Sequence, residues 1–272
     1  MRFIYQPRPE EIDSMPAADL RRSFLLDALF EAGRLNLVYT SVDRMIVGGV
    51  MPAGQMPLPS LPELGTASFT ERREVGLINI GDPGAISAGG SRYELNRLDC
   101  LYVGLGDEVV FEAPASGQPA YYLLSCPAHQ RYPTRRVTPA EADAVEIGDE
   151  RHASRRTIRK LIHPGGVRSC QLVMGITELA PNSVWNTMPP HLHSRRSEIY
   201  LYFDLGDELL VHLMGTPDRT RHLIVRDRQA VVSPEWSLHS GAGTACYRFI
   251  WGMAGENQTF SDIDPVPPQS LR

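Results

Sequence analysis

The sequence contains almost no lysine, few cysteines and no long apolar run. Lys160 is the only lysine, so a Schiff-base mechanism would have to use that one side chain. The cysteines form no Cys-x-x-Cys pair, and each lies in an apolar context, which favours buried free thiols in a reducing cytoplasm. The four are Cys100, Cys126, Cys170 and Cys246.

Membrane and nucleic-acid partners are not favoured either. No apolar stretch approaches the roughly 20 residues of a membrane helix, and the N-terminal segment MRFIYQPRPEEIDSM has no apolar signal region. The net charge of -5 gives no basic surface for nucleic acid. We therefore expect a cytoplasmic globular protein with one large or two medium domains, and 272 residues can bury a core without disulfides.

Short β-like runs dominate the chain from Leu35 onward. LNLVYT, GLINIG, LYVGLG, AYYLLSC and EIYLYFDL are separated by glycine, proline, asparagine and aspartate. Many short strands at regular spacing predict an all-β sandwich or barrel. Only two helices are expected: one from Pro16 to about Ala32, stopped by Gly33, and a short basic one near Ser154–Ile162.

An internal repeat divides the chain. LYVGLGDE at 101–108 matches LYFDLGDE at 201–208 in six of eight positions, which predicts two similar β-barrels in tandem. The expected domains are an N-terminal arm and helix, a degenerate barrel without metal ligands, a connecting segment and a metal-binding barrel. Their ranges are 1–34, 35–131, 132–165 and 166–272.

The chemistry is concentrated between Thr187 and Gly206, TMPPHLHSRRSEIYLYFDLG. Because strand side chains alternate between faces, His191 and His193 point the same way, about 6–7 Å apart along the backbone. Glu198 lies at an odd offset and faces them only if the polar segment 194–197 forms a turn. With His239 from a later strand, these side chains predict a site for zinc, or for manganese, iron, cobalt or nickel.

The repeat suggests that this site occurs once. At an offset of 100 residues, the positions of the first two histidines and the glutamate are occupied by Ser91, Tyr93 and Leu98. None of these three forms the same ligand set. One metal ion per chain, in the second barrel, is therefore expected.

The spacing of these ligands is similar to the two short motifs of the cupin superfamily. They read His191-x-His193-x4-Glu198 and Pro234-x4-His239, with Trp236 standing where a glycine is usual. Longer segments resemble the 5-keto-4-deoxyuronate isomerase family (4-deoxy-L-threo-5-hexosulose-uronate ketol-isomerases) over essentially the whole chain. The most specific are NTMPPHLHSRRSEIYLYF, SPEWSLHSGAGT and FIWGMAGEN, at 186–203, 233–244 and 249–257.

The resemblance implies a bicupin fold of two tandem double-stranded β-helices, and a zinc ion held by residues matching His191, His193, Glu198 and His239. It implies an intramolecular oxidoreductase that converts 5-dehydro-4-deoxy-D-glucuronate to 3-deoxy-D-glycero-2,5-hexodiulosonate in pectin breakdown. It also implies a homo-oligomer, typically a hexamer. A metal suits this reaction because it can polarise a carbonyl and stabilise an enediolate.

Several points stay open in the sequence. Arg195 and Arg196 are candidates for binding the substrate carboxylate, because arginine forms forked hydrogen bonds with carboxylates, or they merely form a polar turn. The catalytic base is unknown; proximity in sequence suggests Glu235, Tyr200, Tyr202 and Glu256. The alternative functions are a 5-deoxy-glucuronate isomerase of inositol catabolism, a cupin dioxygenase, and a non-catalytic sugar-binding bicupin.

Overall fold

The protein, seen in a computed structural model that describes all 272 residues, is built almost entirely of strands. Its one α-helix is α1 (Ala17–Phe24), and the 3-10 helices are η1 (Pro9–Ser14), η2 (Val42–Arg44), η3 (Pro62–Leu64) and η4 (Pro268–Ser270). No helix is long and apolar enough to span a membrane. The chain forms two compact units: residues 1–3, 28–143 and 160–174 make unit 1, and residues 4–27, 144–159 and 175–272 make unit 2.

Most of unit 1 consists of two sheets. One has the strand order β1-β3-β4-β11-β6-β9-β12 and the other β5-β10-β7-β8. Their bounds are β1 Arg2–Ile4, β3 Leu35–Thr40, β4 Ile46–Val50, β5 Met56–Pro57, β6 Arg73–Asn79, β7 Gly84–Ala88, β8 Ser91–Leu95, β9 Cys100–Val103, β10 Val109–Phe111, β11 Tyr121–Pro127 and β12 Arg135–Val137.

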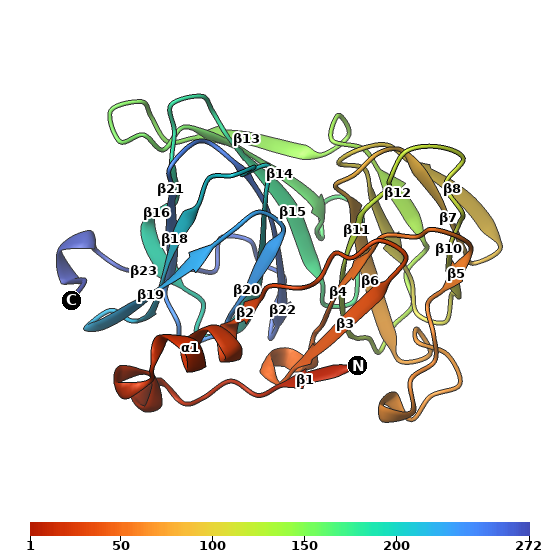
Figure 1. Cartoon of the computed structure of the whole chain (residues 1–272), viewed down its shortest axis with the longest axis horizontal. Coiled ribbons are helices and arrows are strands. Elements are labelled where there is room, and N and C mark those ends of the chain that lie inside the picture. The colour runs from red at the N-terminus through yellow and green to blue at the C-terminus, as the bar shows by residue number, and fades with distance from the viewer. The chain divides into compact units, whose positions relative to one another are not determined.

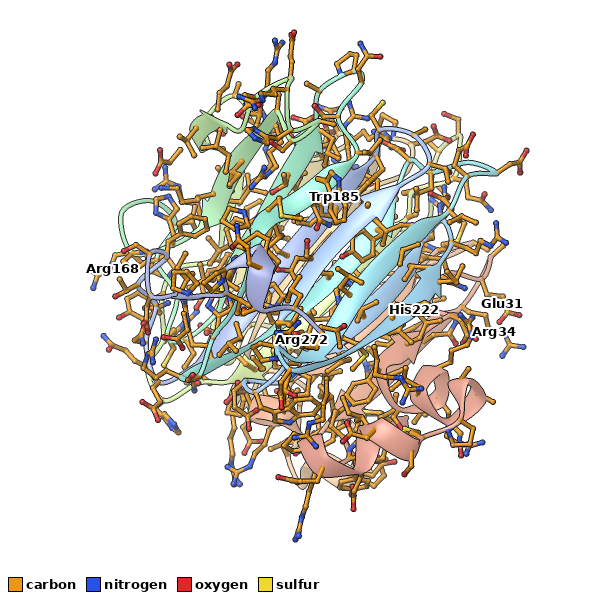
Figure 2. The ribbon with its side chains drawn as sticks, turned by 90° about the vertical axis from the view of Figure 1, so that its left-hand side faces the viewer. Glu31, Arg34, Arg168, Trp185, His222 and Arg272 are labelled. Atoms are coloured by element: carbon orange, nitrogen blue, oxygen red, sulfur yellow. The ribbon has the colours of Figure 1, made fainter.

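Most of unit 2 also consists of two sheets, of order β13-β14-β15-β22-β17-β20-β2 and β19-β18-β21-β16-β23. Figure 1 shows β16, β18 and β21 on one side of this unit and β20 and β22 on the other, while Figure 2 looks onto the five-stranded sheet, with Trp185 on β16 and His222 on β19. The bounds are β2 Leu25–Leu26, β13 Asp143–Ile147, β14 Arg156–Ile162, β15 Val173–Leu179, β16 Trp185–Leu192, β17 Arg196–Phe203, β18 Leu210–Thr216, β19 Arg219–Val225, β20 Gln229–Ser233, β21 His239–Gly243, β22 Arg248–Gly255 and β23 Asp264–Pro265.

The all-β bicupin prediction is confirmed. The two units repeat one topology, because β5-β10-β7-β8 corresponds strand for strand to β16-β21-β18-β19, and β3-β4-β11-β6-β9 to β14-β15-β22-β17-β20. Each pair of sheets is therefore the same double-stranded β-helix. The functional division of the chain into 1–34, 35–131, 132–165 and 166–272 stays a prediction.

This topology corrects the residue equivalence drawn from the repeat. The first LYVGLGDE begins on β9, whereas the second begins on β17, which corresponds to β6. The third residues of β6 and β17 are Val75 and Glu198, and they pair with the last residues of β9 and β20, Val103 and Ser233. Valine thus stands in unit 1 where the glutamate stands in unit 2, and the equivalence of Leu98 with Glu198 was wrong.

Apolar side chains fill the interior of unit 1. Val75 belongs to a buried cluster with Leu77, Leu101, Phe111 and Leu123, all at most 2 % exposed. Such an interior excludes water and offers no ligand to a cation.

Two expected helices differ from the structure. The first ends at Phe24 instead of continuing to Ala32, because Leu25 and Leu26 pair with Val231 and Ala230 of β20. The helix expected near 154–162 is wrong: Arg156–Ile162 is strand β14. In both places pairing with adjacent strands of a sheet outweighs a local preference for helix.

A buried carboxylate fastens a loop of unit 1. The Glu74 side chain is fully buried and accepts hydrogen bonds from the backbone N–H groups of Cys170, Gln171 and Leu172 at 2.6, 2.7 and 2.8 Å. The Tyr102 hydroxyl donates to the same carboxylate at 2.7 Å. One carboxylate therefore accepts from these four donors, and the donors of Leu172 and Tyr102 belong to buried residues.

Replacing Glu74 with leucine is expected to lower the free energy of unfolding by about 4 kcal/mol or more, because each buried donor left unpaired costs about 1–3 kcal/mol. Urea denaturation of the variant measures the loss. Glu108→Leu, at an exposed position of the same unit, is the control and should change stability by less than about 1 kcal/mol. Equal stabilities of the two variants would contradict this role for Glu74.

Candidate metal centre

A tight turn brings Glu198 back to the histidines. β16 ends at Leu192, and the N–H of Arg196 donates to the carbonyl of His193 at 3.0 Å as β17 begins. The predicted turn over 194–197 is thus shorter than expected, since Arg196 and Ser197 already lie in the strand and are buried. The turn leaves Glu198 facing inward, at the third position of β17.

The structure brings His191, His193, Glu198 and His239 together. Their ligand atoms all lie within 4.8 Å of one another. His191 pairs with His239 across β16 and β21, with ring centroids 4.6 Å apart. Oε2 of Glu198 lies 2.9 Å from Nε2 of His193 and 3.2 Å from Nε2 of His239. The four side chains thus point their ligand atoms at one place.

The outer hydrogen bonds show that this place suits a cation. Nδ1 of His193 lies 3.1 Å from the carbonyl oxygen of Asp262 and 3.3 Å from Nη2 of Arg196. Nδ1 of His239 lies 3.1 Å from the Ser233 hydroxyl, which itself donates to the carbonyl of Ser237. Nε2 of each ring faces the Glu198 carboxylate; that of His193 is hydrogen-bonded to it, and that of His239 has no hydrogen-bond partner. Imidazole nitrogens and a carboxylate oxygen that converge in this way form a ligand set for a divalent cation.

Protons on the histidines are a poor substitute for that ion. Burial, chiefly, lowers the pKa of His191 to about 4 and moves the pKa of His239 well below its usual value. Burial alone would raise the pKa of Glu198, but the hydrogen bond and charge of His193 outweigh it, so the pKa is lowered. At neutral pH His191 and His239 are therefore neutral and Glu198 is a carboxylate, the forms that bind metal ions.

A buried histidine outside the cluster was missed in the sequence. His212 on β18 is fully buried, and its Nδ1 is hydrogen-bonded to the Tyr202 hydroxyl at 2.8 Å, while Asn186 donates to the same hydroxyl at 3.3 Å. Burial lowers the pKa of His212 to about 3. The signal in the sequence is its spacing of two residues from Leu210 and Met214, which are buried on the same strand. Side chains two residues apart in a strand lie on the same face, so His212 lies on the buried face as well.

The lowered pKa values of His191 and His212 predict a pH-dependent stability. A histidine in the unfolded chain gains a proton near pH 6.5, whereas His191 and His212 in the folded chain do so only near 4 and 3. Between pH 6.5 and 4 the unfolded state therefore binds more protons, so the free energy of unfolding falls as pH falls, by roughly 3 kcal/mol per histidine. Urea denaturation of metal-free protein across this range measures the slope. The exposed His222 serves as control, since His222→Ala should keep the full slope; a flat profile for the wild type would contradict the prediction.

A cavity of about 440 Å³ adjoins the four side chains. This volume is within the range of ligand-binding clefts, about 300–1,000 Å³. Its walls are mostly apolar and include Ile158, Phe249, Trp251 and Met253. Three of the four clustered residues, all but His239, also line it. A small ligand in this cavity therefore meets the cluster between largely apolar walls.

The NTMPPH segment forms part of this cavity by means of a bulge. Asn186 pairs with Gly241, and His191 pairs with His239. Between these two pairs β16 advances by five residues, whereas β21 advances by two. The four residues of β16 between these paired positions are Thr187, Met188, Pro189 and Pro190, and all four line the cavity. Prolines suit such a place because they cannot donate a ladder hydrogen bond.

The two arginines proposed to bind substrate lie outside the cavity lining. Nε and Nη2 of Arg195 pair with the Asp262 carboxylate, and Nη2 also contacts Asp264 at 2.9 Å. Arg196 is 1 % exposed, and its Nη2 donates to the Asp262 carbonyl at 2.6 Å. The Arg195 guanidinium is therefore already paired with two carboxylates of its own chain. Arg196 donates to the same Asp262 carbonyl that contacts His193.

Among the four candidates for the base, only Tyr200 lines the cavity. Its hydroxyl is hydrogen-bonded to Glu198 and Thr187, and burial raises its pKa well above the usual value, so it carries its proton at neutral pH. Glu235 and Glu256 are exposed, and Tyr202 instead contacts His212. The base stays unassigned.

The fold and the site define the class: a bicupin with a single cluster of three histidines and a glutamate that can hold a metal ion. The chain belongs to the KduI/IolB family, which it matches over residues 26–265. It is 54% identical over 275 residues to a 4-deoxy-L-threo-5-hexosulose-uronate ketol-isomerase of Opitutus terrae, and 48% identical over 276 residues to one of Caldicellulosiruptor bescii. Both alignments cover 100% of each chain.

Solved structures support the same fold. An IolB-like protein from Salmonella typhimurium aligns with a TM-score of 0.71 at 16% identity, covering 89% of this chain and 96% of that one. An oxalate decarboxylase of Lactobacillus farciminis aligns with a TM-score of 0.58 at 10% identity, covering 81% and 79%. At these identities the likeness shows the fold alone.

Proposed function

We propose that the chain is a metal-dependent aldose–ketose isomerase that converts 4-deoxy-L-threo-5-hexosulose uronate to 3-deoxy-D-glycero-2,5-hexodiulosonate in the breakdown of pectin and related uronates. The observation that carries the proposal is 54% identity, over the whole chain, to a relative named for this activity. The cluster within the cavity supplies the chemical setting that such a reaction requires.

We propose His191, His193, Glu198 and His239 as the metal ligands and zinc as the metal. Three imidazoles and one carboxylate suit zinc, and manganese, iron, cobalt and nickel accept the same donors. A divalent ion bound there supplies Lewis acidity toward the carbonyl and hydroxyl oxygens at C1 and C2 of the substrate. The hydrogen bonds from His193 to Asp262 and from His239 to Ser233 support this assignment, because they hold each ring with Nε2 inward.

The side chains around the cluster shape the environment of the substrate and orient one ligand. The apolar walls, including Trp251 and Met253, exclude water from the reacting end of the substrate. The protonated Tyr200 hydroxyl orients the Glu198 carboxylate. The proton transfer between C1 and C2 requires a base that we leave unassigned.

The wider setting is also a proposal. Four free cysteines are consistent with a reducing cytoplasm, and the resemblance suggests a homo-oligomer, in particular a hexamer. Light scattering of the purified protein measures its subunit number.

The activity is tested by incubating the purified, zinc-loaded protein with the keto-uronate and following the product by NMR. Conversion is expected, with no uptake of oxygen. Conversion of 5-deoxy-glucuronate instead would favour the inositol-pathway alternative, and oxygen consumption would reveal a dioxygenase. Calorimetric binding of the uronate without any product would favour a non-catalytic sugar-binding bicupin.

A further inference from the structure

One arginine faces the cavity from the seven-stranded sheet. Arg156 is the first residue of β14 and the only arginine or lysine that lines the cavity beside the four clustered residues. Its side chain is 7 % exposed. An ionised group in such an apolar surround is costly unless an anion accompanies it.

No acidic residue pairs with this guanidinium. Nη1 donates to the carbonyl of Ser154 at 2.7 Å, and no carboxylate lies within ion-pair distance. Neighbouring arginines are paired: Arg155 lies 3.2 Å from Glu150, and Arg159 lies 2.8 Å from Glu178. Burial lowers the pKa of Arg156, but a guanidinium stays charged at neutral pH. The Arg156 guanidinium thus lies at the cavity wall, charged and without an acidic partner.

We propose that Arg156 binds the C6 carboxylate of the substrate and so selects uronates over neutral sugars. This inference rests on the proposed function, in which the substrate carries one carboxylate, at the end of the carbon chain opposite the reacting C1. The cluster and Arg156 line one cavity, and Arg156 is near enough to His191 to act on it electrostatically. A substrate held at both ends would have its aldehyde directed to the cluster.

Charge selectivity tests the proposal. The wild type, Arg156→Met and Arg155→Met are compared for kcat/KM with the keto-uronate and with its uncharged C6 methyl ester. We expect the wild type and Arg155→Met to prefer the acid by about 100-fold, a ratio typical of one lost charge-assisted hydrogen-bonded pair. In Arg156→Met the preference should fall to near one, chiefly through a higher KM for the acid, with metal content unchanged.

Arg156→Lys provides a second variant should the methionine variant fail to fold. Lysine keeps the charge but not the planar fork, so its preference for the acid should lie between those of the wild type and the methionine variant. If the wild type turns over the acid and either Arg156 variant keeps the full preference, this assignment is overturned while the isomerase function stands. If the wild type converts neither compound, the proposed function and this assignment fall together.

Discussion

His191→Ala is expected to remove the bound metal ion and to lower kcat/KM by at least about 1,000-fold. The imidazole is one of four groups that converge within 4.8 Å, and it faces His239 across adjacent strands. Without it, the ion would lose one of its four protein ligands, and the Lewis acidity that a bound ion would supply, worth several kcal/mol in such reactions, would be lost with it. Metal analysis of the purified variant and steady-state kinetics measure the two effects together.

The control for this substitution is His222→Ala. His222 is an exposed histidine on β19, outside the cavity, so its removal deletes an imidazole without touching the cluster. This control should keep one metal ion per chain and wild-type kinetics. An alanine variant of His191 with full metal content and full turnover would contradict the assignment of the site.

Complete removal of the metal with a chelator is expected to lower kcat/KM by a similar factor. It should also lower thermal stability, because an ion that binds only the folded state stabilises it by about 4 kcal/mol at a concentration 1,000 times its Kd. Without the ion, the three histidines and Glu198 lose the ligand that would hold their four side chains together. Activity assays and thermal denaturation before and after dialysis measure both losses.

Re-addition of metals completes this experiment. Zinc should restore turnover at one equivalent per chain, and manganese, cobalt and nickel should restore it to different extents. Magnesium should fail, because it prefers oxygen ligands in octahedral geometry to three imidazoles. Turnover that survives complete metal loss would exclude the proposed chemistry.

The metal cluster could be predicted because its information is local. A spacing of two residues puts His191 and His193 on one face of any strand, and the short polar segment before Glu198 allows only a turn. Alternating short strands likewise define an all-β fold without reference to distant contacts. The same local reasoning failed for 154–162, where a basic, helix-compatible segment became strand β14.

The repeat shows a different limit. LYVGLGDE and LYFDLGDE are alike because both end a strand and enter a turn, yet they begin on β9 and β17, which are not equivalent. Sequence identity over eight residues does not say which neighbours a strand pairs with. The ladders on either side of β6 and β17 align Val75 with Glu198 and identify what unit 1 lacks.

The sequence by itself determined the strand-rich fold, the four converging side chains and the class of ion that they suit, since each follows from alternation, turn composition or ligand chemistry. Only the tertiary structure decided which arginine faces the cavity. Arg195, beside the ligands in the chain, is occupied by Asp262 and Asp264, whereas Arg156, distant in the chain, lines the cavity without an acidic partner. The physical reason is that a guanidinium can bind a ligand only if no carboxylate of the protein already pairs with it. Strand pairing and packing decide this, because they bring together residues that are far apart in the chain.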